Sequence, residues 1–199
     1  TVMNENYEHP AMPEGAEAGI LKGMYLLRKG GKGKGPRVQL LGSGTILREV
    51  IAAADLLKKD WGIEADIWSC PSFTQLARDG VATARWNLLH PTAEPRKPYV
   101  QQCLENTEGP AIASTDYVRA FAEQIRPYVP GRYQVLGTDG FGRSDTREKL
   151  RHFFEVDRYW VTTTSLAALA EEEKFDPARV AEAVRKYGID PEKPNPLTV

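Results

Sequence analysis

The chain has 199 residues and a formal net charge of -1, with 26 lysine and arginine residues against 27 aspartate and glutamate residues. This length is enough for one domain with a buried core, and the balanced, scattered charges exclude the basic excess that nucleic-acid-binding proteins usually show. The two cysteines, Cys70 and Cys103, lie in unlike contexts, so neither a disulfide framework nor a zinc site is indicated.

No apolar run approaches the length that crosses a bilayer, and the first residues lack a signal-peptide pattern. Together with the unpaired cysteines, this predicts a cytoplasmic protein that has neither a membrane nor a nucleic acid as a partner. The longest basic cluster, RKGGKGKGPR at 28–37, alternates with glycine and predicts a flexible surface loop.

The elements begin after an irregular stretch at 1–15. Residues 17–28 are predicted to form a helix, because their apolar residues recur at helical spacing. Four strand-to-helix units follow. Their strand segments are RVQLLGSG at 37–44, GIEADIWSCPS at 62–72, GPAIASTD at 109–116 and RYQVLGTDG at 132–140.

An apolar stripe supports the helix after each of the first and third strands, at 46–57 and 116–129, and Ser72 is placed to cap the helix after the second. Residues 158–172 fit either a short strand leading into a helix or a helix throughout. Asp176 caps the last helix and Gly188 ends it. A proline-rich tail at 189–199 completes the chain.

This alternation of strands and helices predicts the α/β class. Strands separated by helices cannot pair as hairpins, so they pair in parallel through right-handed crossovers, with helices on both faces of the sheet.

The turn at Gly42, Ser43 and Gly44 joins a strand to a helix, where free backbone N–H groups can hold an anion. The pattern is incomplete for a dinucleotide site, because the third glycine position is Leu47, and the Gly-Lys-Ser/Thr ending of a P-loop is absent. A tight turn is therefore the favoured explanation of these glycines, ahead of nucleotide binding.

A second glycine-rich joint, LGTDGFGRSDTREKLRHFFEVD at 136–157, places Ser144 or Asp145 to cap a helix. Asp139, Arg143, Asp145 and Arg147 put four charges into nine residues beside an open backbone. A local structural role is sufficient to explain these residue types, and a subunit contact or the lining of a channel is the alternative that the four charges leave open.

The three histidines do not form a catalytic constellation. His9, His90 and His152 have no serine, cysteine or carboxylate at the spacing of a triad or a metal pair. His90 is the strongest candidate for a functional contact, because it ends a helix beside a proline-rich loop.

Six blocks, in order, resemble the carboxy-terminal domain of the homodimeric bacterial pyruvate dehydrogenases. They are TVMNENYEHPAMPEG, RVQLLGSGTILREV, SFTQLARDG, RWNLLHP, IASTDYVRAFAEQIRPYVP and VLGTDGFGRSDTREKLRHFFEVD. The last block is also similar to a stretch of the final domain of transketolases, which belong to the same thiamine diphosphate superfamily. The resemblance covers essentially the whole chain.

The resemblance implies a three-layer α/β/α domain with a mainly parallel five-stranded sheet and one antiparallel edge strand. It implies that residues 1–199 are one domain, with a linker at 1–15, of a longer enzyme, which agrees with the initial threonine. That enzyme decarboxylates pyruvate on thiamine diphosphate with magnesium and acetylates the lipoyl group of the acetyltransferase component.

In such an enzyme this domain serves the homodimer and the active-site entrance, and other domains hold the cofactor. We therefore expect no catalytic, cofactor-binding or metal-binding residue in this chain. His90, Asp139, Arg143, Ser144 and Asp145 are expected at an interface or at the entrance of the active site. The alternative is a free-standing α/β module that binds an anion or a nucleotide at one of the two glycine-rich joints.

Overall fold

A five-stranded sheet forms the centre of the computed structural model, which describes residues 6–33 and 35–199. The strands are β1 (Tyr25–Arg28), β2 (Arg37–Gly42), β3 (Glu64–Ser69), β4 (Ala111–Ser114) and β5 (Tyr133–Leu136). They are ordered β1-β3-β2-β4-β5, and every pairing is parallel except that of β1 with β3. The predicted mainly parallel sheet with one antiparallel edge strand is confirmed.

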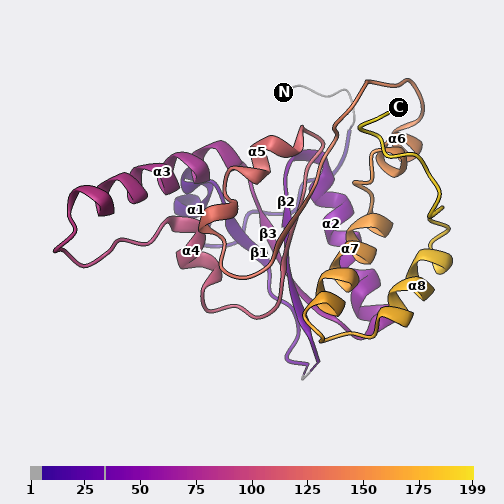
Figure 1. Ribbon diagram of the computed structural model, residues 1–199, viewed down its shortest axis with the longest axis horizontal. Helices are drawn as coiled ribbons and strands as arrows, with labels where there is room; N and C mark the ends of the chain where they lie inside the picture. Colours follow the sequence, from indigo (N-terminus) through magenta and orange to yellow (C-terminus); the bar gives the residue numbers. More distant parts are fainter. Residues whose placement is uncertain (1–5, 34) are drawn as a thin grey trace.

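Helices cover both faces of this sheet (Figure 1). On one face lie α1 (Glu17–Lys22), α3 (Phe73–Leu89), α4 (Tyr99–Leu104), α5 (Arg119–Glu123) and the short η3 (Arg126–Tyr128). On the other lie α2 (Leu47–Leu56), flanked by the short η1 (Gly44–Ile46) and η2 (Leu57–Trp61), with α6 (Arg147–Phe153), α7 (Arg158–Glu171) and α8 (Pro177–Lys186). The expected three layers are present.

Each face of the sheet has its own hydrophobic core. Leu40 of β2 and Ile67 of β3 belong to the core under α2 and α7, whereas their chain neighbours Leu41 and Trp68 belong to the core under α3 and α4. Successive side chains of a strand point to opposite faces of the sheet. The apolar runs in the sequence therefore supply both cores at once.

The prediction of one helix over residues 17–28 is wrong in its second half. Gly23 ends α1 with a left-handed φ of 104°, and a Cβ at this position would lie 2.6 Å from the carbonyl oxygen of Ser72. The chain then extends, and Tyr25 pairs with Ser69 in the antiparallel edge strand. Met24, which fits the helical spacing, is instead fully buried at the turn.

The other helix predictions fare differently. Ser72 accepts a hydrogen bond from Gln75 N, and Asp176 accepts one from Ala178 N, so both predicted caps are confirmed. Residues 158–171 are helical throughout. The helix expected over 116–129 is instead divided into α5 and η3.

The glycine-lysine segment is less free than predicted. The buried carboxylate of Asp66 accepts hydrogen bonds from Gly30 N at 2.8 Å and Lys29 Nζ at 3.1 Å, and Glu64 accepts one from Gly31 N at 2.8 Å. Burial by itself would raise the pKa of Asp66, but the hydrogen bonds from Gly30 N and Lys29 Nζ outweigh burial and lower this pKa. Residues 29–31 are thus anchored to β3.

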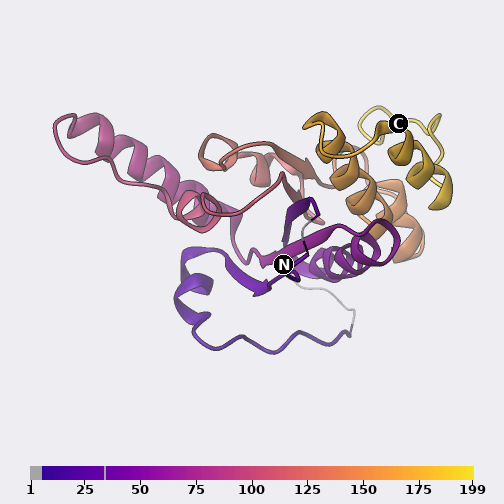
Figure 2. The same cartoon turned by 90° about the horizontal axis from the view of Figure 1, so that it is seen from below.

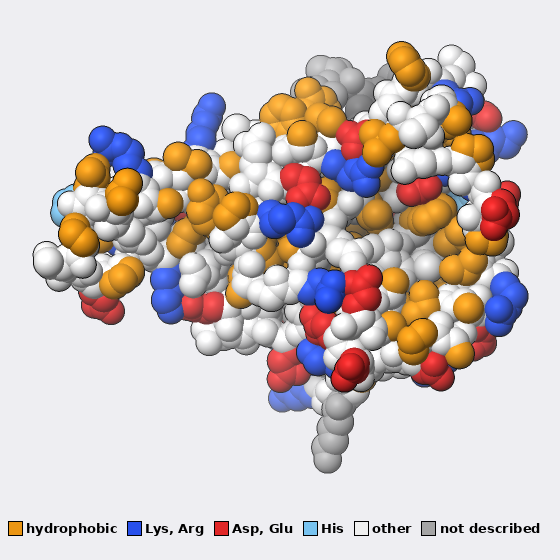
Figure 3. Space-filling view, viewed as in Figure 1, with side chains coloured by type: hydrophobic (Ala, Val, Ile, Leu, Met, Phe, Trp, Pro, Cys, Tyr) orange, Lys and Arg blue, Asp and Glu red, His pale blue; other side chains and the backbone are white. Residues whose placement is uncertain are grey.

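Helix α3 projects from the body of the molecule (Figures 1 and 2), and its last buried residue is Gly80. Gly80 itself is buried against Tyr128, since a Cβ there would lie 2.2 Å from the ring. Residues 81–98, here called the arm, comprise the outer part of α3 and the segment that returns to α4. Most arm residues are exposed, and apolar side chains cover part of this projection (Figure 3).

Candidate functional site

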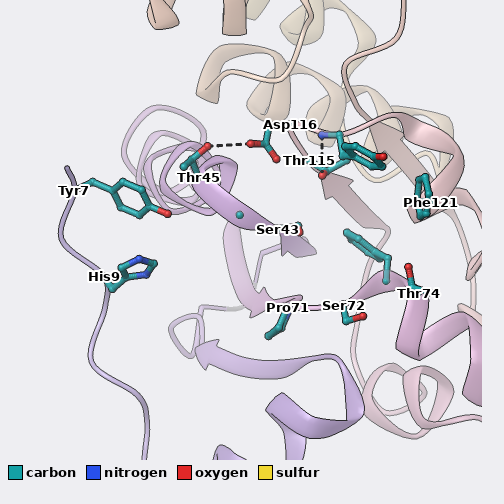
Figure 4. Close-up of a pocket in the computed structure, with 13 residues that line it drawn as sticks. Tyr7, His9, Ser43, Thr45, Pro71, Ser72, Thr74, Thr115, Asp116 and Phe121 are labelled. Carbon is teal, nitrogen blue, oxygen red and sulfur yellow. Dashed lines mark hydrogen bonds between the residues drawn. The ribbon is translucent and has the colours of Figure 1, made fainter. Parts of the chain in front are cut away.

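A cavity of about 650 Å³ lies beyond the carboxyl ends of β2, β3 and β4 (Figure 4). Strands β2 and β4 are neighbours, but β2 connects to β3 on one side and β4 connects to β5 on the other. Ligands of open α/β sheets bind at such a switch point. The cavity is lined by Tyr7, His9, Ser43, Gly44, Thr45, Pro71, Ser72, Phe73, Thr74, Thr115, Asp116, Tyr117 and Phe121.

Several hydroxyl groups in this cavity already have local partners. Thr45 Oγ1 donates to Asp116 Oδ2 at 3.3 Å, whereas Thr115 Oγ1 accepts from Tyr117 N at 3.2 Å (Figure 4). Ser72 Oγ caps α3. These bonds order the ends of the strands and account for the residue types without a ligand.

The glycine turn at the end of β2 is poorly suited to an anion. Gly44 adopts a left-handed φ of 57°, and a Cβ there would lie 3.1 Å from Asp116 Oδ1. The Asp116 carboxylate is therefore close to the N–H groups that could attract an anion, and its charge repels one. At Gly42 a Cβ would lie 2.8 Å from the side chain of Leu47, so helix packing accounts for that glycine.

The cavity does not assemble a catalytic pair from its described residues. His9 lies beside Tyr7, with ring centroids 4.7 Å apart, and within 6–33 and 35–199 it is hydrogen-bonded to none of the cavity hydroxyls. Over the same ranges no group of three His, Cys, Asp or Glu side chains could hold a metal ion. The geometry can bind a ligand, but it offers no nucleophile with an adjacent base.

Of the predicted interface residues, His90 lies on the arm, directly after the last residue of α3. Its ring stacks on Trp86 with centroids 4.3 Å apart, and its Nδ1 is 2.8 Å from the Trp86 carbonyl oxygen. Arg96 covers the same indole at 3.7 Å. His90 therefore contributes to an exposed aromatic platform rather than to the cavity.

Asp139 joins two strand-end loops within the chain. Its carboxylate accepts hydrogen bonds from Arg119 N at 3.2 Å and Arg119 Nε at 2.5 Å, and its side chain is 14% exposed. The loop after β5 is thereby fixed to the segment after β4.

The neighbouring residues Arg143, Ser144 and Asp145 are all exposed. Arg143 lies over the Phe153 ring at 4.3 Å. Contrary to the prediction, neither Ser144 nor Asp145 caps α6. Thr146 does, by accepting from Lys149 N, while Asp145 accepts from the backbone N–H of Thr146. Residues 139–145 lie in one loop, which leads into α6. Helix α6 and the outer end of the arm lie at opposite ends of the molecule (Figure 1).

A buried carboxylate that the sequence analysis did not single out is Glu49. Its oxygens accept from Arg158 N at 3.1 Å, Nε at 2.8 Å and Nη2 at 3.1 Å, and Arg151 lies at 3.4 Å. Burial would raise the pKa of Glu49, but the hydrogen bonds and charge of Arg158, helped by Arg151, lower it. In the sequence, Glu49 could have been recognised as a buried carboxylate because it lies three residues after Ile46, on the apolar stripe of α2.

Asp116 was also missed. It directly follows β4 and lines the cavity, and the signal for it was a carboxylate at the carboxyl end of a parallel strand. Within the described parts of the chain, no helix is long and apolar enough to cross a lipid bilayer.

Comparison with known proteins identifies relatives over the whole chain. The chain is 70% identical to the pyruvate dehydrogenase E1 component of Cupriavidus necator over 100% of its length, and 56% identical to that of Escherichia coli over 98%. It spans about a fifth, 22%, of the length of either relative.

Solved transketolase structures share the fold. The enzyme from Campylobacter jejuni superposes with a TM-score of 0.51 at 18% identity, covering 80% of this chain and 20% of the transketolase. A transketolase from Pichia stipitis gives 0.52, also at 18% identity, over 79% and 19%. The model of the transketolase-like TK C-terminal domain matches residues 23–157, and the chain therefore belongs to this family.

Proposed function

We propose that this chain is the carboxy-terminal domain of the first component of a pyruvate dehydrogenase complex. The whole enzyme decarboxylates pyruvate on thiamine diphosphate with magnesium and reductively acetylates the lipoyl group of the acetyltransferase component, in the cytoplasm. The observation that carries the proposal is the 70% identity over the entire chain to a protein named for this component.

The proposal gives the chain an architectural role. Residues 1–199 form one domain, with 1–15 as a linker from a preceding domain and 189–199 as a tail. The switch-point cavity offers one carboxylate, Asp116, whose charge opposes a diphosphate, and within residues 6–33 and 35–199 no group of three His, Cys, Asp or Glu side chains could hold a metal ion, which supports a cofactor site outside this chain. The cofactor is accordingly assigned to other domains of the enzyme.

The arm supports a role in assembling the homodimer. Val81 is 61% exposed, Leu88 77% and Leu89 54%, next to the platform of Trp86 and His90. Clustered apolar side chains of this kind mark protein-protein contacts, in which aromatic residues and arginine often dominate the binding energy. A second copy of the chain is the proposed occupant, and Arg96 over Trp86 supplies the polar rim.

The anion-binding or nucleotide-binding module receives no support at the Gly42–Gly44 turn. The Asp116 carboxylate beside Gly44 opposes an anion there.

Two measurements test the proposal. The complete polypeptide that carries these 199 residues should release carbon dioxide from pyruvate only when both thiamine diphosphate and magnesium are present. Titration calorimetry of the 199-residue chain with the same cofactor and metal should give no heat of binding. A micromolar dissociation constant, about -8 kcal/mol, would contradict the assignment of the cofactor to other domains.

A further inference from the structure

The carboxy-terminal tail, residues 189–199, turns back over the body of the chain. In Figure 1 it leads from α8 back to α6. Pro196 of the tail is buried, and the side chain of Lys193 is only 13% exposed. This irregular segment is thus packed against folded structure. The structure that it meets is α6 together with residues 137–146, here called the β5 loop.

The ammonium group of Lys193 lies in a cage of two aromatic rings and a carboxylate. Its Nζ is 2.8 Å from Glu155 Oε1, 5.1 Å from the centroid of the Phe153 ring and 5.6 Å from that of Trp160. An ammonium within about 6 Å of an aromatic ring is attracted by the face of the ring, more strongly where water is excluded. Lys193 therefore fastens the tail to α6 and α7.

Two features of this cage are unfavourable in themselves. Glu155 adopts a left-handed φ of 63°, a conformation in which glycine is favoured at the end of a helix. Trp160 Nε1 is buried and meets no acceptor among the residues that the structure describes. The ammonium of Lys193 explains both residue types, because it uses the carboxylate of Glu155 and the ring face of Trp160.

The same Phe153 ring also holds the β5 loop. The guanidinium of Arg143 lies over this ring at 4.3 Å, so one cation of the loop and one of the tail contact a single side chain. The tail and the loop also meet directly, because a Cβ at Gly140 would collide with the carbonyl oxygen of Pro196. The left-handed φ of 97° at Gly140 suits a glycine at this close approach.

A third contact faces the ion pair that fixes the β5 loop. Asp139 and Arg119 line a narrow gap of about 50 Å³, and residues 195–197 of the tail line the same gap. Within the tail, Asn195 accepts hydrogen bonds from Leu197 N at 3.0 Å and Thr198 N at 2.9 Å, which fix a turn at this point. The tail thus meets the loop as an ordered turn.

We propose that the tail is a strap that holds the β5 loop in place, and that Lys193 is the latch of this strap. With the ammonium seated in its cage, Pro196 rests on Gly140 and the loop is held against α6. When Lys193 leaves the cage, the tail and the β5 loop open together while the sheet stays folded. The strap consists of contacts within this chain, so it stands whether or not the proposed function is correct. The loop that it controls carries Asp139 and residues 143–145, which we expect at a subunit interface or at the entrance of the active site.

Hydrogen exchange of the complete polypeptide, followed by mass spectrometry, tests the strap. Thr138 N donates to the Tyr117 carbonyl oxygen at 3.0 Å, and Thr198 N donates to that of Asn195, so these amides report on the β5 loop and on the tail. Lys193→Met keeps a long side chain and removes its charge. We expect exchange in the peptides that contain both amides to rise about tenfold or more, because hydrogen bonds to charged groups are lost. Exchange of β2 should stay within about twofold of the parent, since local opening leaves the sheet intact.

Two matched variants separate the latch from a general loss of charge. Lys193→Arg retains a cation that can pair with Glu155 and lie over the rings, and it should keep exchange of the β5 loop within about threefold of the parent. Lys174→Met removes a half-exposed lysine that pairs with Glu172 at 2.8 Å, outside the cage, and it should leave the loop unchanged.

Glu155→Gly distinguishes a latch from a contact that only stabilises the fold. Glycine relieves the left-handed backbone at this position, so exchange of β2 should not rise. Loss of the carboxylate should nevertheless raise exchange of the tail and of the β5 loop by about threefold or more. A contact with a purely structural role would change all three segments together.

Three outcomes would overturn the proposal. Faster exchange of the tail alone in Lys193→Met, or no change in either segment, would show that the tail does not hold the β5 loop. Equal increases in the tail, the loop and β2 would indicate that the whole domain is destabilised. An effect of Lys174→Met on the loop as large as that of Lys193→Met would remove Lys193 as the latch.

Discussion

The helices on the two faces of the sheet are buried within the chain to different extents. On the face of α2, α7 and α8, the central helix α7 is buried on several sides, so that Val161 and Leu169 as well as the polar Thr162 and Ser165 are inaccessible. On the opposite face α3 is buried only up to Gly80, and its outer part exposes Val81, Leu88 and Leu89. Helix α7 is thus covered within the chain, whereas the outer part of α3 leaves apolar surface that a further protein surface can cover.

The largest expected effect comes from placing charges on the arm, the exposed part of the second layer. Leu88→Asp combined with Leu89→Asp puts two charges on the arm, and we expect it to weaken self-association of the complete polypeptide about a hundredfold, because central interface residues often contribute ~2 kcal/mol or more. Sedimentation velocity over a dilution series measures the dimer constant.

The matched control for the arm is Leu21→Asp, which changes a leucine that is 80% exposed on α1. It should leave the dimer constant within about threefold of the parent, as surface substitutions away from an interface usually do. An unchanged dimer constant in the arm variant, with native circular dichroism, would remove the arm from the interface.

On the face of α2, α7 and α8, the second-largest effect is expected from the removal of one buried carboxylate. Glu49→Gln removes the charge that holds Arg158 and Arg151 between α2, α6 and α7, and we expect a loss of about 2 kcal/mol in the free energy of unfolding, typical of hydrogen bonds to charged groups. Urea unfolding at pH 7 measures it. Arg158 is 42% exposed, so water can solvate part of the charge that is left behind and limits the loss.

The pH dependence of the free energy of unfolding provides a second test of the Glu49 charge. The pKa of Glu49 is lowered in the folded state from its ordinary value of 4.5, so its contribution to stability is present above pH 4.5 and is lost as the pH falls through the lower folded value. The difference between the parent and Glu49→Gln should therefore shrink in acid. A difference that stays constant between pH 7 and pH 3 would contradict the role of the charge.

The contrast between the layers also shows what the sequence can predict. The strands β2, β3, β4 and β5 lie in the predicted segments, because buried parallel strands appear as short apolar runs followed by helical periodicity. The edge strand β1 was mistaken for helix because Leu27 continues the spacing of Ile20 and Met24, and only the packing of Gly23 against Ser72 ends α1 early.

The candidate site was harder to predict than the fold. His90 and the Asp139 loop were recognised as unusual, but the partner of Asp139 is Arg119, twenty residues away across two strand ends. Such a contact depends on strand order. The projection of the arm likewise has no local signal, because the apolar pattern of α3 does not reveal where the helix leaves the body.

A smaller effect is expected at the junction between the β4 and β5 loops, where Asp139 serves loop geometry. Asp139→Asn keeps the shape but weakens two hydrogen bonds from Arg119, and we expect it to cost about 1 kcal/mol of unfolding free energy. Hydrogen exchange at residues 137–142 should rise, whereas that of β2 should not. Under the proposed function, loss of about a hundredfold or more in the turnover of the complete polypeptide with normal assembly would instead indicate an acid or base.

The smallest effect is expected inside the core of the open layer, where both cysteines are free thiols. Cys70 is fully buried, and burial raises the pKa of both thiols, although a hydrogen bond from Tyr99 and the charge of Lys22 partly oppose the shift at Cys103. Protonated thiols are poor nucleophiles and do not exchange readily. A reductant should therefore leave the melting temperature unchanged to within about 1 °C, and Cys103→Ser should cost less than about 1 kcal/mol. Scanning calorimetry measures the melting temperature of the parent with and without dithiothreitol, and that of the Cys103→Ser variant. A clear fall in the parent's melting temperature on reduction would mean that a disulfide supports this layer. An unchanged melting temperature would show that no disulfide supports the open side, whose exposed apolar side chains on the arm, Val81, Leu88 and Leu89, are the surface that we propose a partner covers.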